Sequence, residues 1–245
     1  MKSTFIVKIF LFFAIVLTGP LSAEQRQVLQ ENIAKARVGD FIVTHQGKMF
    51  SVLHIRGKTE TGLILEEISA PRDRIPKNKY NWREWVEDNA PGHSSWVMYR
   101  LNTKSGVIES SFSYTQNSWF KIRESDNFLT ALLNIPFYKI SLKDRKRVGP
   151  KGFHPAGNEM RDVWQPKMVV NGQTIENITF DAWKARWPND GTELAGKMIE
   201  VYIPEENTNY PSYFPYWLQI SGIIGKAKIR IVESGGELKS PKPIM

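Results

Sequence analysis

The 245-residue chain contains no cysteine, and this absence removes several kinds of chemistry. No disulfide can stabilise the fold, and no thiol can act as a nucleophile or as a soft metal ligand. A lipid anchor attached through a cysteine is excluded for the same reason. We therefore expect a fold that depends on buried apolar side chains and on backbone hydrogen bonds.

Histidine is scarce, and familiar metal-binding and nucleotide-binding motifs are lacking. The chain has four histidines, and no two of them have the H-x-x-x-H spacing of a zinc site, so we predict no metal. No glycine-rich phosphate loop is present, and we predict no cofactor. The sequence GHSSW at 92–96 departs from the G-x-S-x-G motif of hydrolases, because Trp96 stands where that motif requires glycine.

The apolar run near the start of the chain is too short to span a membrane. Ile9–Leu17 contains nine apolar residues, and as a helix it would cover about 14 Å, against a hydrocarbon core of about 30 Å. Lys2 and Lys8 flank its start, and small residues ending at Ala23 follow it. This order is typical of a secretory signal peptide, cleaved after residue 23. We expect a mature chain without a transmembrane segment, in the periplasm or on the outer envelope surface of a bacterium.

Acidic residues are outnumbered by basic ones. Lys and Arg total 33 and Asp and Glu total 25, which gives a net charge of +8. Removal of the two lysines in residues 1–23 leaves +8 − 2 = +6 for the mature chain. This balance favours anionic partners such as lipid head groups or acidic glycans, and the alternative is that the charge serves solubility without a partner. Export makes nucleic acid the least favoured of the anionic partners, and we predict none.

Apolar and polar residues alternate most clearly in the last third of the chain. Ile199, Val201 and Ile203 fall on one side of a predicted strand, and the same period recurs over 216–220 and 226–232. This pattern is typical of antiparallel strands with one buried and one exposed face. We predict a C-terminal β-meander within an α+β fold that is mostly antiparallel β with a few short helices.

The N-terminal region also contains a group of predicted strands, over 41–45, 48–56 and 63–68. The middle strand has apolar residues on both faces, which indicates a tightly curled sheet or a small barrel. Gly39-Asp40-Phe41, with Gly47 and Gly62, resembles the start of an SH3-like barrel. That resemblance implies a small, barrel-like N-terminal lobe.

Helical periodicity predicts short helices over 24–37, 80–88 and 128–133. Residues 162–173 and 176–188 are compatible with either a strand or a helix. The charged, proline-containing stretch 71–79 marks a boundary, so we divide the chain into a signal peptide (1–23), a barrel-like lobe (24–75) and an α+β lobe (76–245). A sheet crossed by helices in an exported protein is similar in outline to the lipid-carrier folds of the bacterial envelope.

Aromatic residues are concentrated between 210 and 217, where the sequence is YPSYFPYW. Two prolines restrict the backbone there, and the rings can stack on sugars or line a lipid groove. The alternative is that they cap the core at the entrance to a strand. The predicted ligand-binding residues are Tyr210, Tyr213, Phe214, Tyr216 and Trp217.

A basic segment at 143–151 holds five positive charges and one negative charge in nine residues. It is interpreted as a loop that docks on an anionic surface, and the alternative is a solvated loop with no partner. The predicted surface-binding residues are Lys143, Arg145, Lys146, Arg147 and Lys151.

These observations favour a non-catalytic envelope protein that binds an anionic lipid, a glycan or an envelope protein. One alternative is a hydrolase of cell-wall or lipid material that uses His93, Ser94 and His154 as catalytic residues. Another is a structural or assembly factor of the envelope.

Overall fold

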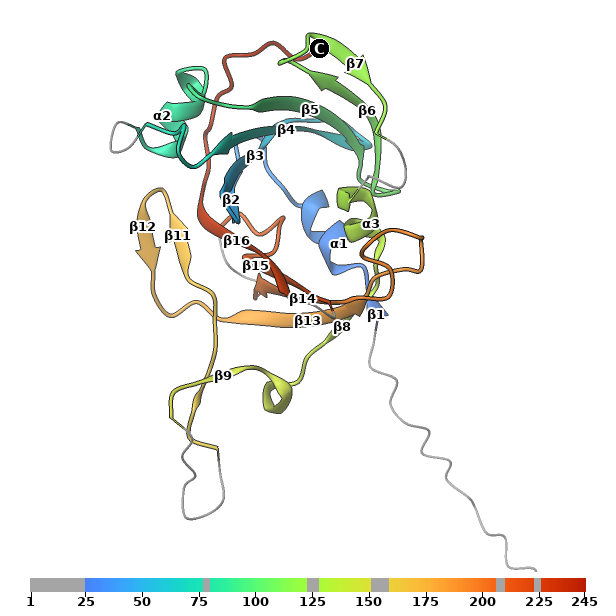
Figure 1. The fold of residues 1–245 in the computed structure, drawn as a ribbon, viewed down its shortest axis with the longest axis vertical. Coiled ribbons are helices and arrows are strands. Elements are labelled where there is room, and N and C mark those ends of the chain that lie inside the picture. Colours follow the sequence, from blue (N-terminus) through green and yellow to red (C-terminus); the bar gives the residue numbers. More distant parts are fainter. Residues whose placement is uncertain (1–24, 77–79, 123–127, 151–158, 206–209, 223–225) are drawn as a thin grey trace, which may run out of the picture.

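The computed structural model describes residues 25–76, 80–122, 128–150, 159–205, 210–222 and 226–245. The predicted signal peptide, Lys151 and His154 lie outside these ranges. Most of the described strands form one strongly curled sheet (Figure 1). None of the described helices is long and apolar enough to cross a membrane.

Neighbouring strands of the large sheet are antiparallel along its whole main path. From one edge to the other the order is β1 (Gln25–Arg26), β8 (Phe137–Lys139), β13 (Phe180–Arg186), β14 (Met198–Pro204), β15 (Trp217–Ser221), β16 (Lys226–Gly235), β2 (Phe41–Gln46), β3 (Met49–Lys58), β4 (Gly62–Pro71), β5 (Ser95–Asn102), β6 (Val107–Ser113) and β7 (Ser118–Phe120).

Two short ribbons lie off this path. The hairpin of β11 (Met168–Val170) and β12 (Gln173–Ile175) joins β16 through one parallel pair, Val170 with Ser234. β9 (Arg147–Val148) and β10 (Asp162–Val163) form a separate two-stranded ribbon. It is preceded by a 3₁₀ turn over Leu142–Asp144.

Two helices lie inside the curve of the sheet, and one lies outside it (Figure 1). α1 (Val28–Ala34) and α3 (Phe128–Asn134) bury Leu29, Ile33 and Leu132 in the inner core. α2 (Trp82–Glu87) buries Trp85 and Val86 in a second core, on the outer face of β2 to β5.

The mostly antiparallel α+β prediction is confirmed, but the small N-terminal barrel is not. The predicted strands β2, β3 and β4 do not close on themselves, because β16 pairs with β2 and β5 pairs with β4. β3 is apolar on both faces because Val52 packs under α2 while Leu53 and Ile55 face the inner core. The described sheet stays open, with β1 and β7 at its ends.

The chain after β16 crosses the outer face of β3 to β6 and ends near β7 (Figure 1). Leu238 packs in the outer core, and Ser240 Oγ donates a 2.9 Å hydrogen bond to Glu66. Arg56 donates to the backbone oxygens of Lys242 and Pro243. The C-terminal segment is thus attached by polar contacts to the side of the sheet that α2 leaves open.

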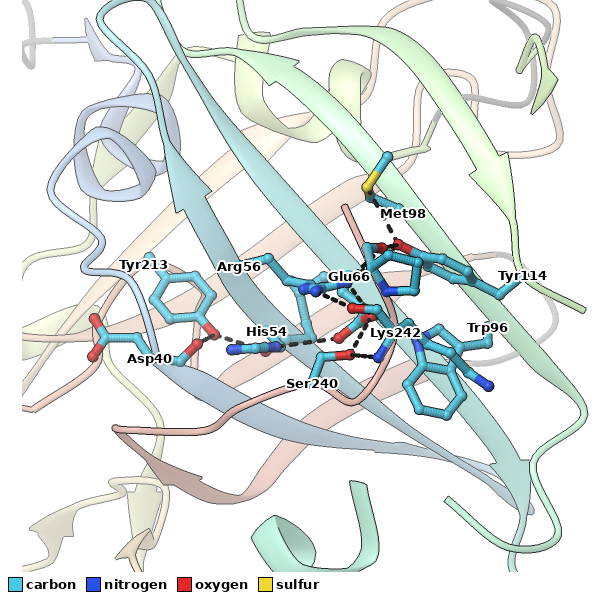
Figure 2. A network of polar contacts seen from close by, with 12 residues as sticks. Asp40, His54, Arg56, Glu66, Trp96, Met98, Tyr114, Tyr213, Ser240 and Lys242 are labelled. Atoms are coloured by element: carbon cyan, nitrogen blue, oxygen red, sulfur yellow. Dashed lines mark hydrogen bonds and ion pairs between the residues drawn. The ribbon is translucent and has the colours of Figure 1, made fainter. Parts of the chain in front are cut away.

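Glu66 is the centre of these contacts (Figure 2). Its side chain is fully buried. Among the described residues, four side chains donate to its two oxygens: Trp96 at 2.7 Å, Ser240 at 2.9 Å, Arg56 at 3.1 Å and His54 at 3.2 Å. A buried carboxylate needs such compensation, because burial removes its hydration.

Candidate ligand-binding site

A cleft of about 910 Å³ lies between α1 and the strands β13 and β14. Its lining includes the aromatic side chains of Trp183, Tyr210 and Tyr213, here called the aromatic wall, together with basic and acidic side chains. The short strands β1 and β8 contribute Arg26 and Lys139 to it. The cleft is therefore assembled from parts of the sequence that are far apart.

The aromatic wall is held rigidly. Trp183 of β13 is buried, and Tyr213 is buried with its hydroxyl donating a 2.8 Å hydrogen bond to the Leu53 carbonyl. Burial, together with the nearby charge of Asp40, raises the pKa of Tyr213 well above its ordinary value, so the phenol stays neutral. The Tyr216 hydroxyl contacts Ser234 Oγ at 2.7 Å and donates to the Pro211 carbonyl at 3.1 Å, which fixes this segment at the cleft.

Basic side chains outnumber acidic ones in the lining of the cleft. The four basic residues are Arg26, Lys35, Arg37 and Lys139, and the three acidic ones are Asp40, Asp181 and Glu205, so the lining carries +4 − 3 = +1. Lys35, Arg37 and Lys139 are exposed, so solvent reaches this part of the cleft.

The acidic side chains in the lining are bound by neighbours. Asp181 forms ion pairs with Lys139 at 2.8 Å and with Arg145 at 3.3 Å. Asp40 accepts a 2.9 Å hydrogen bond from the Arg37 backbone, and burial raises the pKa of its carboxyl. Asp181 is thus shared between one cation of the lining, Lys139, and one outside it, Arg145.

The predicted aromatic residues do not share one site. Tyr210 and Tyr213 line the cleft, whereas Phe214 and Tyr216 are buried in the core. Trp217 on β15 belongs to a different groove, of about 440 Å³, where its ring centroid lies 5.0 Å from that of Trp164.

The two sites lie on opposite faces of the sheet. Trp183 and Lys184 are consecutive on β13, so their side chains point to opposite faces. Trp183 lines the cleft, and Lys184 lines the groove with Trp217.

The predicted basic residues have three different roles in the structure. Arg145 is buried and donates to the Phe180 carbonyl at 2.6 Å, so the surface-docking interpretation does not fit this side chain. Arg147 donates to the backbone oxygens of Arg161 (2.8 Å) and Leu142 (3.2 Å). Lys143 is exposed, and Lys146 is exposed with its Nζ 4.6 Å from the Trp164 ring.

The geometry gives no support to the hydrolase alternative at the two described residues. His93 Nδ1 lies 2.9 Å from the Ala90 carbonyl, and Ser94 Oγ donates to the Ser69 carbonyl at 3.1 Å. Each side chain satisfies a backbone group of the turn before β5, rather than forming a nucleophile–base pair.

The described residues contain no cluster of three or more potential metal ligands from His, Asp or Glu side chains. His45 lies opposite Phe50, and His54 lies opposite Phe41, in the pairing of β2 with β3. The two histidines therefore do not face each other across this hairpin.

Comparison with known proteins identifies the family. A profile described as "CT021 protein" matches residues 51–176, which is 126 of the 245 residues. The chain belongs to the CT021 protein family. Among solved structures it is similar to the hypothetical protein CT021 from Chlamydia trachomatis, with 17% identity and a TM-score of 0.61 over 89% of this chain and 96% of that one. At this identity the likeness shows the fold alone. No curated protein matches the sequence.

The family match covers only part of the candidate site. It includes Glu66 and the basic segment from Lys143 to Arg147, but neither α1 nor the chain at 210–213. The family match therefore covers the strands and the basic segment within residues 51–176, but only a minor part of the cleft.

Sequence reasoning missed the basic residues of the cleft, namely Arg26, Lys35, Arg37 and Lys139. One usable indication was present: the apolar stripe of the first predicted helix includes Ile33 and Ala36, and Lys35 and Arg37 flank it. Side chains next to the apolar stripe of a helix lie at the edge of the surface that this stripe buries. The contributions of β8 and β13 had no such indication, because these strands are far from α1 in the sequence and line the same cleft only in the fold.

Proposed function

We propose that the protein is an exported binding protein of the bacterial envelope that holds an anionic amphiphile in the cleft beside α1. The observation that carries this proposal is the combination of an aromatic wall with exposed cations in one cleft of about 910 Å³. That volume falls within the range of small-molecule sites, about 300–1,000 Å³. The sequence-based expectation of export supports the envelope location.

Each part of the ligand has a matching part of the cleft. The anionic head group would lie near Lys35, Arg37 and Lys139, which are exposed to solvent. The apolar part would lie against Trp183 and the ring of Tyr210. Because Tyr213 is fixed by its hydrogen bond to Leu53, the wall needs little reorganisation on binding.

Isothermal titration calorimetry with monomeric lysophosphatidylglycerol tests the proposal, with lysophosphatidylcholine and an oligogalacturonate as comparison ligands. We expect one site for the anionic lipid, at least tenfold weaker binding of the zwitterionic lipid, and no comparable affinity for the acidic sugar. A tenfold change corresponds to about 1.4 kcal/mol, less than the roughly 1.5–3 kcal/mol of a hydrogen bond to a charged group.

The double variant K35Q/R37Q should lose at least tenfold in affinity for lysophosphatidylglycerol. The matched control is R74Q/K121Q, which removes the same two charges from exposed positions that do not line the cleft. Equal losses in both variants would show that net charge alone drives binding and would refute the site. If the protein preferred the oligogalacturonate, its ligand would be an acidic glycan and not an amphiphile.

A further inference from the structure

A second surface lies on the excursion between β8 and β11, whose described parts are 140–150 and 159–167. It leaves the curled sheet, forms the β9–β10 ribbon and projects away from the body of the protein (Figure 1). The described parts combine apolar exposure with positive charge.

Large apolar side chains on this excursion are unusually exposed. Met160 and Leu142 have 64% and 62% of their surface exposed, the two largest values among the large hydrophobic side chains of the described residues. Val148, on β9, is 42% exposed. Exposed apolar side chains grouped on one projecting element mark an interaction site more strongly than the same residues scattered singly.

The backbone that carries these side chains is firmly attached. Arg147 binds the backbone oxygens of both Leu142 and Arg161, and so ties the 3₁₀ turn to the return strand. The Trp164 backbone N–H donates to the Lys146 carbonyl at 2.8 Å. Below them, buried Arg145 anchors the excursion to β13 through the Phe180 carbonyl. The apolar side chains are therefore exposed on an ordered support.

Lysine and tryptophan side chains lie on this excursion and in the groove beside it. Lys143 and Lys146 are exposed on it, and Lys184 lines the adjacent groove together with Trp164 and Trp217. The Nζ of Lys146 lies 4.6 Å from the centroid of the Trp164 ring. Tryptophan and lysine together are typical of surfaces that meet a membrane interface, where the ring enters the head-group layer and the ammonium meets phosphate.

We propose that this excursion docks the protein on an anionic lipid bilayer. Leu142, Met160 and Val148 enter the head-group region, while Lys143 and Lys146 contact lipid phosphates. A soluble polyanion would use the lysines but would leave the apolar side chains in water. The bilayer is the partner that buries one set and neutralises the other.

This docking surface is distinct from the proposed amphiphile cleft. The groove beside the excursion and the cleft lie on opposite faces of β13, as Lys184 and Trp183 show. The two regions share one contact, because Asp181 in the cleft binds Arg145 at the base of the excursion. Docking goes beyond the proposed function and can be tested separately from it.

Vesicle co-sedimentation tests docking with phosphatidylglycerol and phosphatidylcholine in equal parts, against pure phosphatidylcholine. We expect binding to the anionic vesicles that weakens with salt, and at least tenfold weaker partitioning of L142S/M160S and of K143Q/K146Q. The matched control V38S/V107S removes two exposed apolar side chains elsewhere and should partition as wild type. L142S/M160S should still bind lysophosphatidylglycerol in the cleft, which also verifies its fold.

Three outcomes would overturn docking by the excursion. The first is absence of binding to anionic vesicles. The second is loss of binding in K143Q/K146Q but not in L142S/M160S, which would show electrostatic attraction to any polyanion. The third is loss of vesicle binding in K35Q/R37Q with L142S/M160S unaffected, since lipid would then be captured by the cleft itself.

Discussion

Replacing Glu66 with glutamine should destabilise the protein strongly, because the substitution removes the charge that compensates a buried group of donors. The carboxylate is 0% exposed, and the Arg56 side chain that binds it is 8% exposed. A carboxylate accepts through two oxygens, whereas a glutamine amide accepts through one and places N–H donors where the other stood. Arg56, Trp96 and Ser240 all donate to one oxygen, Oε1, so the amide oxygen can keep these contacts only as a neutral acceptor. The new N–H donors would then take the place of Oε2 opposite His54 Nδ1.

The magnitude follows from the burial of the pair. Removing one partner of a buried ion pair costs about 3–5 kcal/mol, because the other charge is left uncompensated. For a chain of this size each kcal/mol lowers Tm by about 2–4 °C, so the expected decrease is roughly 6–20 °C. Ser240→Ala and Trp96→Phe each remove one donor and leave the carboxylate bound by the others, so each should cost about 1–2 kcal/mol.

Urea unfolding followed by tryptophan fluorescence measures the effect. Glu66→Gln should lower the midpoint with little change in the m-value, since the surface exposed on unfolding is the same. Glu60→Gln, which removes an exposed carboxylate from the β3–β4 turn, is the matched control and should stay within about 0.5 kcal/mol of wild type. If Glu66→Gln behaved like this control, the cluster would not be the compensated buried charge described above.

Three further predictions concern other parts of the chain. Arg145→Met should lower the free energy of unfolding by about 2–3 kcal/mol in urea titrations, because it leaves the Phe180 carbonyl without its charged donor. An unchanged free energy of unfolding would contradict the buried structural role of Arg145. The pKa of Asp40 is raised in the folded chain, so that chain holds the proton to higher pH than the unfolded chain, and this group's contribution to stability falls as pH rises above its ordinary pKa of 3.8. Asp40→Asn keeps an acceptor for the Arg37 N–H, so it should raise the urea midpoint relative to wild type at neutral pH and lose this advantage near pH 3. A variant more stable than wild type near pH 3 but not at neutral pH would contradict this prediction. N-terminal mass spectrometry of protein from its native host should find Glu24 as the first residue, and an intact Met1 would refute export.

Local pattern predicted the elements whose two faces differ. The alternation over Ile199, Val201 and Ile203 corresponds to β14, where these three residues are buried in the core and Glu200 between them is only partly buried. The sequence of 176–188 is compatible with either a strand or a helix, because the apolar residues Phe180, Ala182 and Trp183 are spaced by two and by three positions. It forms β13, a strand paired on both sides, and this pairing decided the outcome.

Long-range pairing is what local pattern could not supply. The two-faced apolar pattern of β3 correctly indicated cover on both sides. The sequence could not show that α2 and Leu238 supply the outer cover, or that β16 extends the sheet beyond β2. Both contacts join residues far apart in the chain, so the local pattern alone predicts a closed unit of three strands.

The candidate site shows the same limit at the scale of single side chains. Arg145 and Lys146 are adjacent in one basic run, yet the first is buried against Phe180 and the second lies over Trp164. In the same way Tyr213 and Trp217 belong to one aromatic run but line different cavities. A run of like residues predicts a kind of chemistry, while the turn or strand that carries it decides which members reach a site.

A crystal structure of the protein with lysophosphatidylglycerol tests the central claim most directly. The account predicts the ligand in the cleft beside α1, with its phosphate within hydrogen-bond distance of Lys35, Arg37 or Lys139 and its chain against Trp183. A ligand bound elsewhere, or one whose phosphate lies away from all three cations, would contradict it.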